Sequence, residues 1–138
     1  MSAPVTLTGR LTADPELRFT AKGDAVLNLR VVTSGRKKTD DGWVDVDTTF
    51  WTVSAWRQMA ENVANSIQKG DAVVVVGKVK SRQYDDKEGN KRTVWEVAAD
   101  HIAADLKWTT VNMQRVERST VAAKQQDDPW ASQEPTPF

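Results

Sequence analysis

The 138-residue sequence has no cysteine, a single histidine and a single tyrosine. Without cysteine the chain can form neither a disulfide nor a thiolate metal site. His101 therefore has no cysteine partner for a zinc site, and no serine and aspartate pattern around it indicates a catalytic triad. No pair of carboxylates is spaced for acid–base chemistry either. We expect a protein that is not an enzyme and that uses no metal or cofactor.

Long hydrophobic runs and nucleotide-binding motifs are also missing. The longest apolar run, residues 72–77, is far too short to cross a bilayer. The N-terminus lacks the basic start and apolar stretch of a signal peptide, so we expect a cytoplasmic protein. Gly77 and Lys78 are followed by Val79, and Ala72 stands where a phosphate loop would need its first glycine. The acids of "TDDGWVDVD" lack the closing glutamate of a calcium loop, which favours a solvated hairpin.

The sequence has no net charge, because 19 basic residues balance 19 acidic ones. The two signs are nevertheless distributed unevenly. Every Lys and Arg lies within residues 1–124, whereas residues 125–138 contain three acidic residues and no basic one. The body is therefore mildly basic and the tail acidic. Whether the basic residues bind a polyanion depends on how they are arranged.

Alternation of apolar and polar residues is the main structural signal that is present. It predicts strands over residues 5–12, 25–35 and 44–56, a fourth over 71–84 with its return at 91–99, and a further short strand within 101–111. Between Trp56 and Gly70 the apolar residues recur every three or four positions, which predicts one helix with Lys69 in its last turn and Gly70 at its C-cap. We therefore expect an all-β fold, a five-stranded OB-fold barrel with one inserted α-helix. The barrel should occupy residues 1–112, followed by a linker and tail at 113–138.

The third predicted strand carries large rings on both faces. "TTFWTVSAW" places Phe50 and Trp56 on one face and Trp51 on the other. One barrel interior cannot absorb both faces, so if Trp51 faces the core, Phe50 and Trp56 point outward. Outward rings beside basic residues are typical of a platform on which unpaired bases stack. The alternative is that the second face, Trp56 above all, packs under the helix or against a subunit.

The fourth predicted strand has a basic face. Lys78, Lys80, Arg82 and Tyr84 alternate with the apolar Val73, Val75 and Val79. Such a track of cations with an aromatic ring suits a flexible nucleic-acid strand, although a solvated face kept charged for solubility is the alternative. Arg10 and Arg30 lie on the polar faces of the first two strands and would extend this surface if those strands adjoin the third.

The tail contains aromatic residues that its composition does not explain. Pro129, Pro135 and Pro137 oppose regular pairing, and the segment has too little apolar surface to fold, so we expect an acidic, disordered tail. We predict that it binds partner proteins. An aromatic anchor, the acids that steer it and the tip should take part in this binding. At the tip, Phe138 is expected to present its ring beside a terminal carboxylate. The residues concerned are Asp127, Asp128, Trp130, Glu134, Pro137 and Phe138.

Four ordered segments and the tip resemble one known family. "LTGRLTADPELRFT", "WRQMAENVANSIQKGD", "VVVVGKVKSRQY" and "EGNKRTVWEV" are similar to successive segments of the bacterial and phage single-stranded DNA-binding proteins. The resemblance implies an OB-fold protomer in a homotetramer that wraps single-stranded DNA. It also implies a nucleoid-associated protein of DNA replication, recombination and repair, whose tail recruits replication and repair proteins.

The resemblance also assigns roles to particular residues. Phe50 and Trp56 match two base-stacking positions of the family, and Tyr84 matches a third that is commonly Trp. A further stacking Trp of some members falls where this chain has "GRKKT", so charge replaces one ring here. The tail departs from the family pattern as well, because its acids are sparser and its linker is short. Alternative functions are an OB-fold RNA-binding or primosomal accessory protein and a purely structural oligomerisation module.

Overall fold

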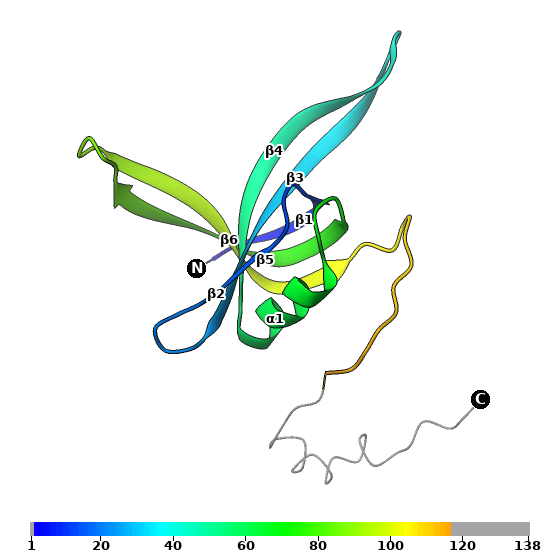
Figure 1. Ribbon diagram of the computed structural model, residues 1–138. Coiled ribbons are helices and arrows are strands. Elements are labelled where there is room, and N and C mark those ends of the chain that lie inside the picture. The colour runs from blue at the N-terminus through cyan, green and yellow to red at the C-terminus, as the bar shows by residue number, and fades with distance from the viewer. Residues whose placement is uncertain (1, 117–138) are drawn as a thin grey trace, which may run out of the picture.

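The computed structural model describes residues 2–116 of the chain, and these residues contain six strands and one helix (Figure 1). In chain order the elements are β1 (Ala3–Leu11), β2 (Glu16–Phe19), β3 (Ala25–Thr39), β4 (Gly42–Trp56), α1 (Arg57–Ser66), β5 (Ala72–Asp85) and β6 (Lys91–Ala104).

Five of the strands close into a barrel. They are hydrogen-bonded in the order β1-β5-β6-β4-β3, and β1 also pairs with β3, which completes the ring. All neighbours are antiparallel except β4 and β6, which run parallel where Val53 and Ser54 meet Val97 and Ala98. The predicted five-stranded OB-fold barrel with its helix is confirmed. The short strand β2, which alternation did not predict, is added to the outer edge of β3.

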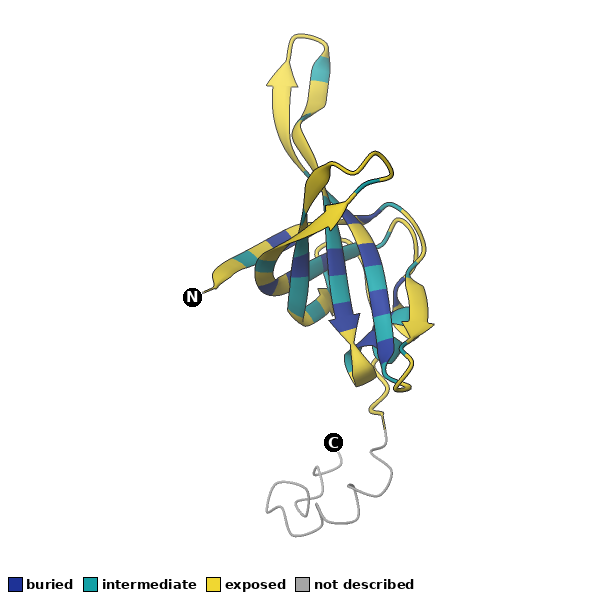
Figure 2. Ribbon diagram, turned by 90° about the vertical axis from the view of Figure 1, so that its left-hand side faces the viewer, coloured by how far each residue is buried: buried dark blue, intermediate teal, exposed yellow. Residues whose placement is uncertain are grey.

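The barrel interior is filled by alternate residues of each strand, as Figure 2 shows by the bands of buried residues. Leu27, Leu29 and Val31 of β3 are completely buried, and so are Val53 and Ala55 of β4. Because neighbouring strands are in register, these side chains meet across the barrel and leave the intervening residues outside. The core thus determines which face of each strand remains for binding.

The ring closes at a glycine. Arg10 and Leu11 are the residues of β1 that pair with β3, and Gly9 immediately precedes them. A Cβ at Gly9 would collide with the carbonyl oxygen of Val32, so the two strands can approach only because this position carries no side chain. Gly9 therefore allows β1 to leave β5 and reach β3.

The helix is shorter than the sequence pattern predicts. Helix α1 ends at Ser66, and the amide of Ile67 donates to the carbonyl of Val63 as the last bond of the helix. Gly70 is therefore not its C-cap. It has φ of +90° in the turn that follows, where its amide donates to the carbonyl of Leu11 in β1. The predicted helical face is correct, because Ala60 and Val63 are buried under the barrel.

Two hairpins extend beyond the barrel in different directions (Figure 1). We call them the β3–β4 arm, residues 33–49, and the β5–β6 arm, residues 81–95. The end of β6 includes His101–Ala104, and residues 105–116 contain no strand, so the separate short strand predicted within 101–111 is wrong. Among residues 2–116, no helix combines the length and apolarity needed to cross a membrane.

Candidate nucleic-acid interface

Strand β4 presents two aromatic rings on its outer face. Val53 and Ala55 point into the core, and Phe50 and Trp56 on the opposite face keep 62% and 50% of their surface exposed. Trp51 lies on the core side, partly buried, and its indole Nε1 donates a hydrogen bond to Thr33 Oγ1 at 2.9 Å. The predicted orientation of these three residues is confirmed, and rings of this size left in solvent beside a filled core are typical of a binding surface.

Strand β3 places polar and basic groups directly beside these rings. Arg30 is in register with Thr52, and Asn28 with Ser54, so both lie between the levels of Phe50 and Trp56. Cross-strand partners share a face, and the Arg30 side chain is therefore outward like the rings. This surface on β3 and β4, made of Asn28, Arg30, Phe50 and Trp56, is called the stacking face below.

The basic residues of β5 lie on the same outer side of the barrel but leave it with the β5–β6 arm. Lys78 pairs with Ala98 of β6, which in turn pairs with Ser54 of β4, so Lys78 is two strands away from the stacking face. Adjacent strands are about 4.8 Å apart, which puts Lys78 roughly 10 Å from Ser54. Further along, Lys80 is exposed just before the β5–β6 arm, and Arg82 and Tyr84 are exposed on it. This arm points away from the β3–β4 arm (Figure 1).

An acidic residue interrupts this basic track. Glu96 of β6 is the cross-strand partner of Lys80, and its Oε1 accepts a hydrogen bond from Arg82 Nε at 3.0 Å. Sequence reasoning missed Glu96, although alternation in "VWEV" puts it on the opposite face from the buried Val97. Arg82 is thus paired, whereas Lys78 and Lys80 form no salt bridge with a described residue.

The turn of the β5–β6 arm is held by Asp86, two residues after Tyr84. Its carboxylate accepts a hydrogen bond from Arg92 Nε at 2.9 Å and others from the amides of Glu88 and Asn90. The Arg92 guanidinium, with help from these amides, holds the pKa of Asp86 below its ordinary value. Arg92 is the register partner of Tyr84, so the same contacts fix the strand that carries the ring.

Arg10 occupies a corner between the two parts of the surface. It faces Val32 of β3, and Val32 faces Phe50 of β4, so the three residues form one row across the outer side of the barrel. The Arg10 Nη1 donates to the carbonyl oxygen of Gly70 at 3.0 Å, which directs its guanidinium toward the loop after α1. Sequence analysis expected Arg10 to extend this surface if the first strand adjoined the third, which is β4. Strand β1 instead pairs with β5 and β3, so Arg10 is separated from Phe50 by Val32 of β3.

Trp43 also belongs to the outer side, and sequence reasoning did not assign it. In the β3–β4 arm, Thr33 pairs with Thr49 but Gly35 pairs with Val46, so two residues along β3 match three along β4. The additional residue forms a β-bulge at Asp47, whose φ is +54°. A bulge changes which of the following residues face outward, and so Trp43, the partner of Lys38, shares the side of Phe50 despite the odd spacing. Its ring is 60% exposed.

Other kinds of site have little support in the described part of the chain. Residues 2–116 contain no group of three His, Asp or Glu side chains able to hold a metal ion. His101 is exposed near the end of β6. The predicted partner-binding residues lie outside the described residues: Asp127, Asp128, Trp130, Glu134, Pro137 and Phe138.

The arrangement is suited to a strand whose bases are unpaired. Exposed rings offer flat faces to any base, and the neighbouring Arg and Lys side chains can meet phosphates whatever the base sequence is. The aromatic rings lie on strands of the barrel wall and of its arms, where their flat faces are open to a base that has no stacking neighbour.

Comparison with known proteins gives one consistent result. The description "Single-strand binding protein family" belongs to the family model that matches residues 3–105. A "Single-stranded DNA-binding protein" of Paenarthrobacter aurescens is 40% identical over 93% of this chain and 85% of the relative, and "Single-stranded DNA-binding protein 2" of Streptomyces coelicolor is 46% identical over 79% and 56%.

A solved structure agrees with these sequence relatives. The crystal structure of a small single-stranded DNA-binding protein from Streptomyces coelicolor superposes with a TM-score of 0.66 and 34% identity, covering 76% of this chain and 95% of that one. The family match covers every strand and the helix of the described residues. The chain therefore belongs to the single-strand binding protein family.

Proposed function

We propose that this protein binds single-stranded DNA without regard to base sequence, in DNA replication, recombination and repair. The observation that carries the proposal is the stacking face, where Phe50 and Trp56 remain exposed on a strand whose other face is buried, with Arg30 beside them. In a duplex the base faces are covered by their neighbours, so rings of this kind are useful only to a strand that is already unpaired.

Phosphate contacts supply the second part of the binding energy. Arg10 and Arg30 adjoin the rings, and Lys78 and Lys80 continue the positive charge onto β5. Arg82 joins them once its contact with Glu96 opens, and Tyr84 adds a third ring on the β5–β6 arm. A strand that follows all these residues passes over the barrel from one arm to the other.

The protein acts as a homotetramer in this proposal. Among the described residues, β1 pairs with β3 only at Arg10 and Leu11, so its edge from Ala3 to Thr8 has no second partner strand. An open strand edge is a template for pairing with another chain, and the exposed Trp95 on β6 adds apolar surface suited to a subunit contact. A mass measurement in solution tests this part: four chains are expected, and a monomer would contradict it.

The tail serves a separate purpose in the proposal. Trp130, Pro137 and Phe138 are the anchors that replication and repair proteins bind, and Asp127, Asp128 and Glu134 steer the approach to a basic partner. No residue of the stacking face is taken from this segment, so DNA binding and recruitment can be separated by mutation.

The DNA-binding proposal is tested with a pair of matched phenylalanines. Phe50 and Phe19 are 62% and 63% exposed, but Phe19 is the register partner of the buried Ala25 and so lies on the side of β3 opposite to the stacking face. Phe50→Ala should weaken binding of oligo-dT by about 1 to 3 kcal/mol, the typical loss for one stacked base, and Trp56→Ala should act similarly. Phe19→Ala should leave the affinity unchanged. Fluorescence titration with the intrinsic tryptophans measures all three variants.

Competition experiments decide between the proposal and its alternative. When a labelled oligo-dT is bound to the protein, unlabelled single-stranded DNA should displace it far better than duplex DNA or RNA does. Equal displacement by RNA would favour an RNA-binding or primosomal accessory function, and no binding of any nucleic acid at low salt would favour a structural oligomerisation module.

A further inference from the structure

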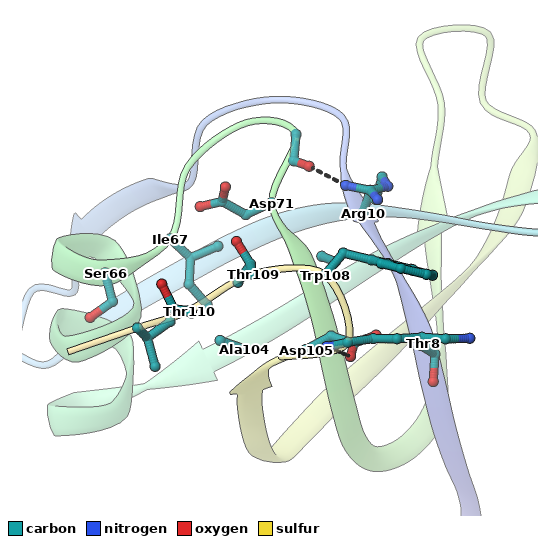
Figure 3. A pocket seen from close by; sticks show the side chains of 15 residues that line it. Thr8, Arg10, Ser66, Ile67, Asp71, Ala104, Asp105, Trp108, Thr109 and Thr110 are labelled. Atoms are coloured by element: carbon teal, nitrogen blue, oxygen red, sulfur yellow. Dashed lines mark hydrogen bonds between the residues drawn. The ribbon is translucent and has the colours of Figure 1, made fainter. Parts of the chain in front are cut away.

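A second surface lies next to the stacking face, on the far side of β1. The segment after β6, residues 105–111, folds across the outer face of β1 and beside the loop that follows α1. Between them is an open hollow of about 530 Å³, whose lining includes Thr8, Arg10, Asp71, Asp105, Lys107 and Trp108 (Figure 3). Its volume lies within the range of small-molecule sites and is sufficient for a nucleotide.

Trp108 is the most exposed tryptophan among the described residues. Its side chain keeps 83% of its surface, so it contributes almost nothing to the core. The ring lies across β1 between Arg10 and Thr8 in Figure 3, and Lys107 Nζ is 5.9 Å from its centroid. An indole with a lysine ammonium over one face and its other face open to solvent is suited to stack on a base while a phosphate lies nearby.

The hollow is continuous with the stacking face through Arg10. The row Phe50, Val32, Arg10 crosses three adjacent strands, so Phe50 and Arg10 are roughly 10 Å apart at about 4.8 Å per strand. Arg10 also lines the hollow together with Trp108. A chain of nucleotides on Phe50 would therefore meet Arg10 next and Trp108 after it.

We propose that Trp108 is a further base-stacking residue and that Arg10 guides single-stranded DNA from the stacking face into the hollow. The inference rests on the proposed function and deepens it, because it extends the bound strand to a surface that neither arm contains. Two acidic residues reduce the positive charge of the hollow. Asp71 and Asp105 offset Arg10 and Lys107, although Asp71 accepts from the amide of Gln68 and Asp105 from that of Lys107. Stacking should thus contribute more here than charge.

An oligonucleotide length series tests the path. With oligo-dT from about 4 to 16 nucleotides, the usual range of site sizes for an OB fold, the shortest binding length should reach only the stacking face. Trp108→Ala should bind that length like the unaltered protein. For longer oligonucleotides, Trp108→Ala should lower the affinity about five-fold or more, which is the lower end of the effect of losing one stacked base. Trp108→Phe should restore most of the loss, and the slope of affinity against salt should not change.

Met113→Ala is the matched control, since Met113 lies two residues beyond the segment 105–111, is an exposed apolar side chain and does not line the hollow. Its affinity should be unchanged at every length. A loss in Trp108→Ala that is equal for short and long oligonucleotides, or a drop in the mass of the assembly in this variant, would overturn the inference.

Photocrosslinking supplies a direct measurement on the unaltered full-length chain. Oligo-dT carrying one 5-iodouridine at successive positions should give peptide adducts at Phe50 or Trp56 and, at a neighbouring position, at Trp108. Adducts at the stacking face without any at Trp108 would overturn the inference and leave the proposed function intact. If no oligonucleotide binds or crosslinks, the proposed function itself fails, and the inference with it.

Discussion

At the scale of single residues, Glu96 determines how much of the basic track is available to DNA. It lies opposite Lys80 and accepts a hydrogen bond from Arg82, so its negative charge offsets part of the positive charge on the proposed path. Both Arg82 and Glu96 retain solvent contact, and exposed pairs of this type add little to folding stability. We therefore expect Glu96 to lower the DNA affinity more than it stabilises the fold.

Replacing Glu96 should strengthen binding. Glu96→Gln keeps the size of the side chain, removes the negative charge and frees Arg82. The affinity for oligo-dT should therefore be higher, and it should decrease more steeply as the salt concentration rises. Lys80→Ala should do the reverse, flattening the slope by about 0.7 log units per log unit of salt for the lost phosphate contact on a single strand. Binding isotherms at several salt concentrations give both slopes.

Glu88→Gln is the matched control for charge, because Glu88 lies in the turn of the same arm and forms no salt bridge with a described residue. If Glu88→Gln raises the affinity as much as Glu96→Gln, the effect is one of net charge, and the specific role of Glu96 is wrong.

Some features of single residues could be predicted from the alternation of apolar and polar residues, whereas others depend on how the strands pair. The outward positions of Phe50 and Trp56 could be predicted because each strand residue faces opposite to its neighbour and one barrel has one interior. The contact between Arg82 and Glu96 could not be predicted, since it depends on the register of β5 against β6 and that register contains a bulge between Val76 and Gly77.

At the scale of elements, the bulge in β4 assigns one more ring to the surface. The β3–β4 arm is a two-stranded ribbon with Lys38 and Trp43 on one side and Lys37 and Val44 on the other. Val32 and Lys38 are six residues apart on β3, about 20 Å at 3.3 Å per residue, and Val26 and Val32 are equally spaced. Trp56, Phe50 and Trp43, the partners of these residues, thus recur at nearly equal steps along the ribbon.

Exchanging two adjacent residues tests whether this side of the arm binds DNA. The double variant Trp43→Val with Val44→Trp moves the indole to the opposite side and leaves the composition unchanged. If the bulge serves to present Trp43 to the strand, the exchange should weaken oligo-dT binding by about 1 kcal/mol or more, like the loss of a stacked base. Fluorescence titration measures the affinity, and circular dichroism verifies the fold.

Trp43→Phe provides the control, because it keeps a ring on the outer side and should bind nearly as well as the unaltered protein. If the exchanged variant and the unaltered chain bind with equal affinity, the side of the arm on which the indole lies does not affect DNA binding, and the proposed role of the bulge is wrong.

Element boundaries were less predictable than element types. The helix was predicted to continue to Gly70, because the apolar spacing persists through Ile67 and a glycine follows a lysine there. In the folded chain the amide of Gly70 bonds to Leu11 on β1, a distant contact that local sequence does not encode. The strand β2 was missed for a similar reason, since its four residues are all exposed and show no alternation of burial.

At the scale of the whole molecule, the fold separates two tasks along the chain. The barrel, its arms and the segment after β6 contain all the residues proposed to meet DNA, between Arg10 and Trp108. The residues proposed to meet other proteins begin at Asp127, well beyond the last strand. The barrel could be predicted because strand order and the inserted helix are local signals. How the arms diverge could not, because that geometry follows from the closure of the barrel.

This separation predicts that recruitment can be abolished without loss of DNA binding. Deleting Pro137 and Phe138 removes the proposed apolar anchor, which is not among the residues proposed to meet DNA, and keeps the acids proposed to steer the tail. Oligo-dT affinity should be nearly unchanged, whereas capture of repair helicases, exonucleases or polymerase subunits from host extract should be lost. A full-length variant with Gln133→Ala and Thr136→Ala serves as the control, since it alters the same segment but retains Trp130, Pro137 and Phe138, and it should capture the same proteins as the unaltered chain. Undiminished capture by the truncated chain would show that the tip does not recruit these partners, and reduced DNA affinity would show that the two tasks are not separate.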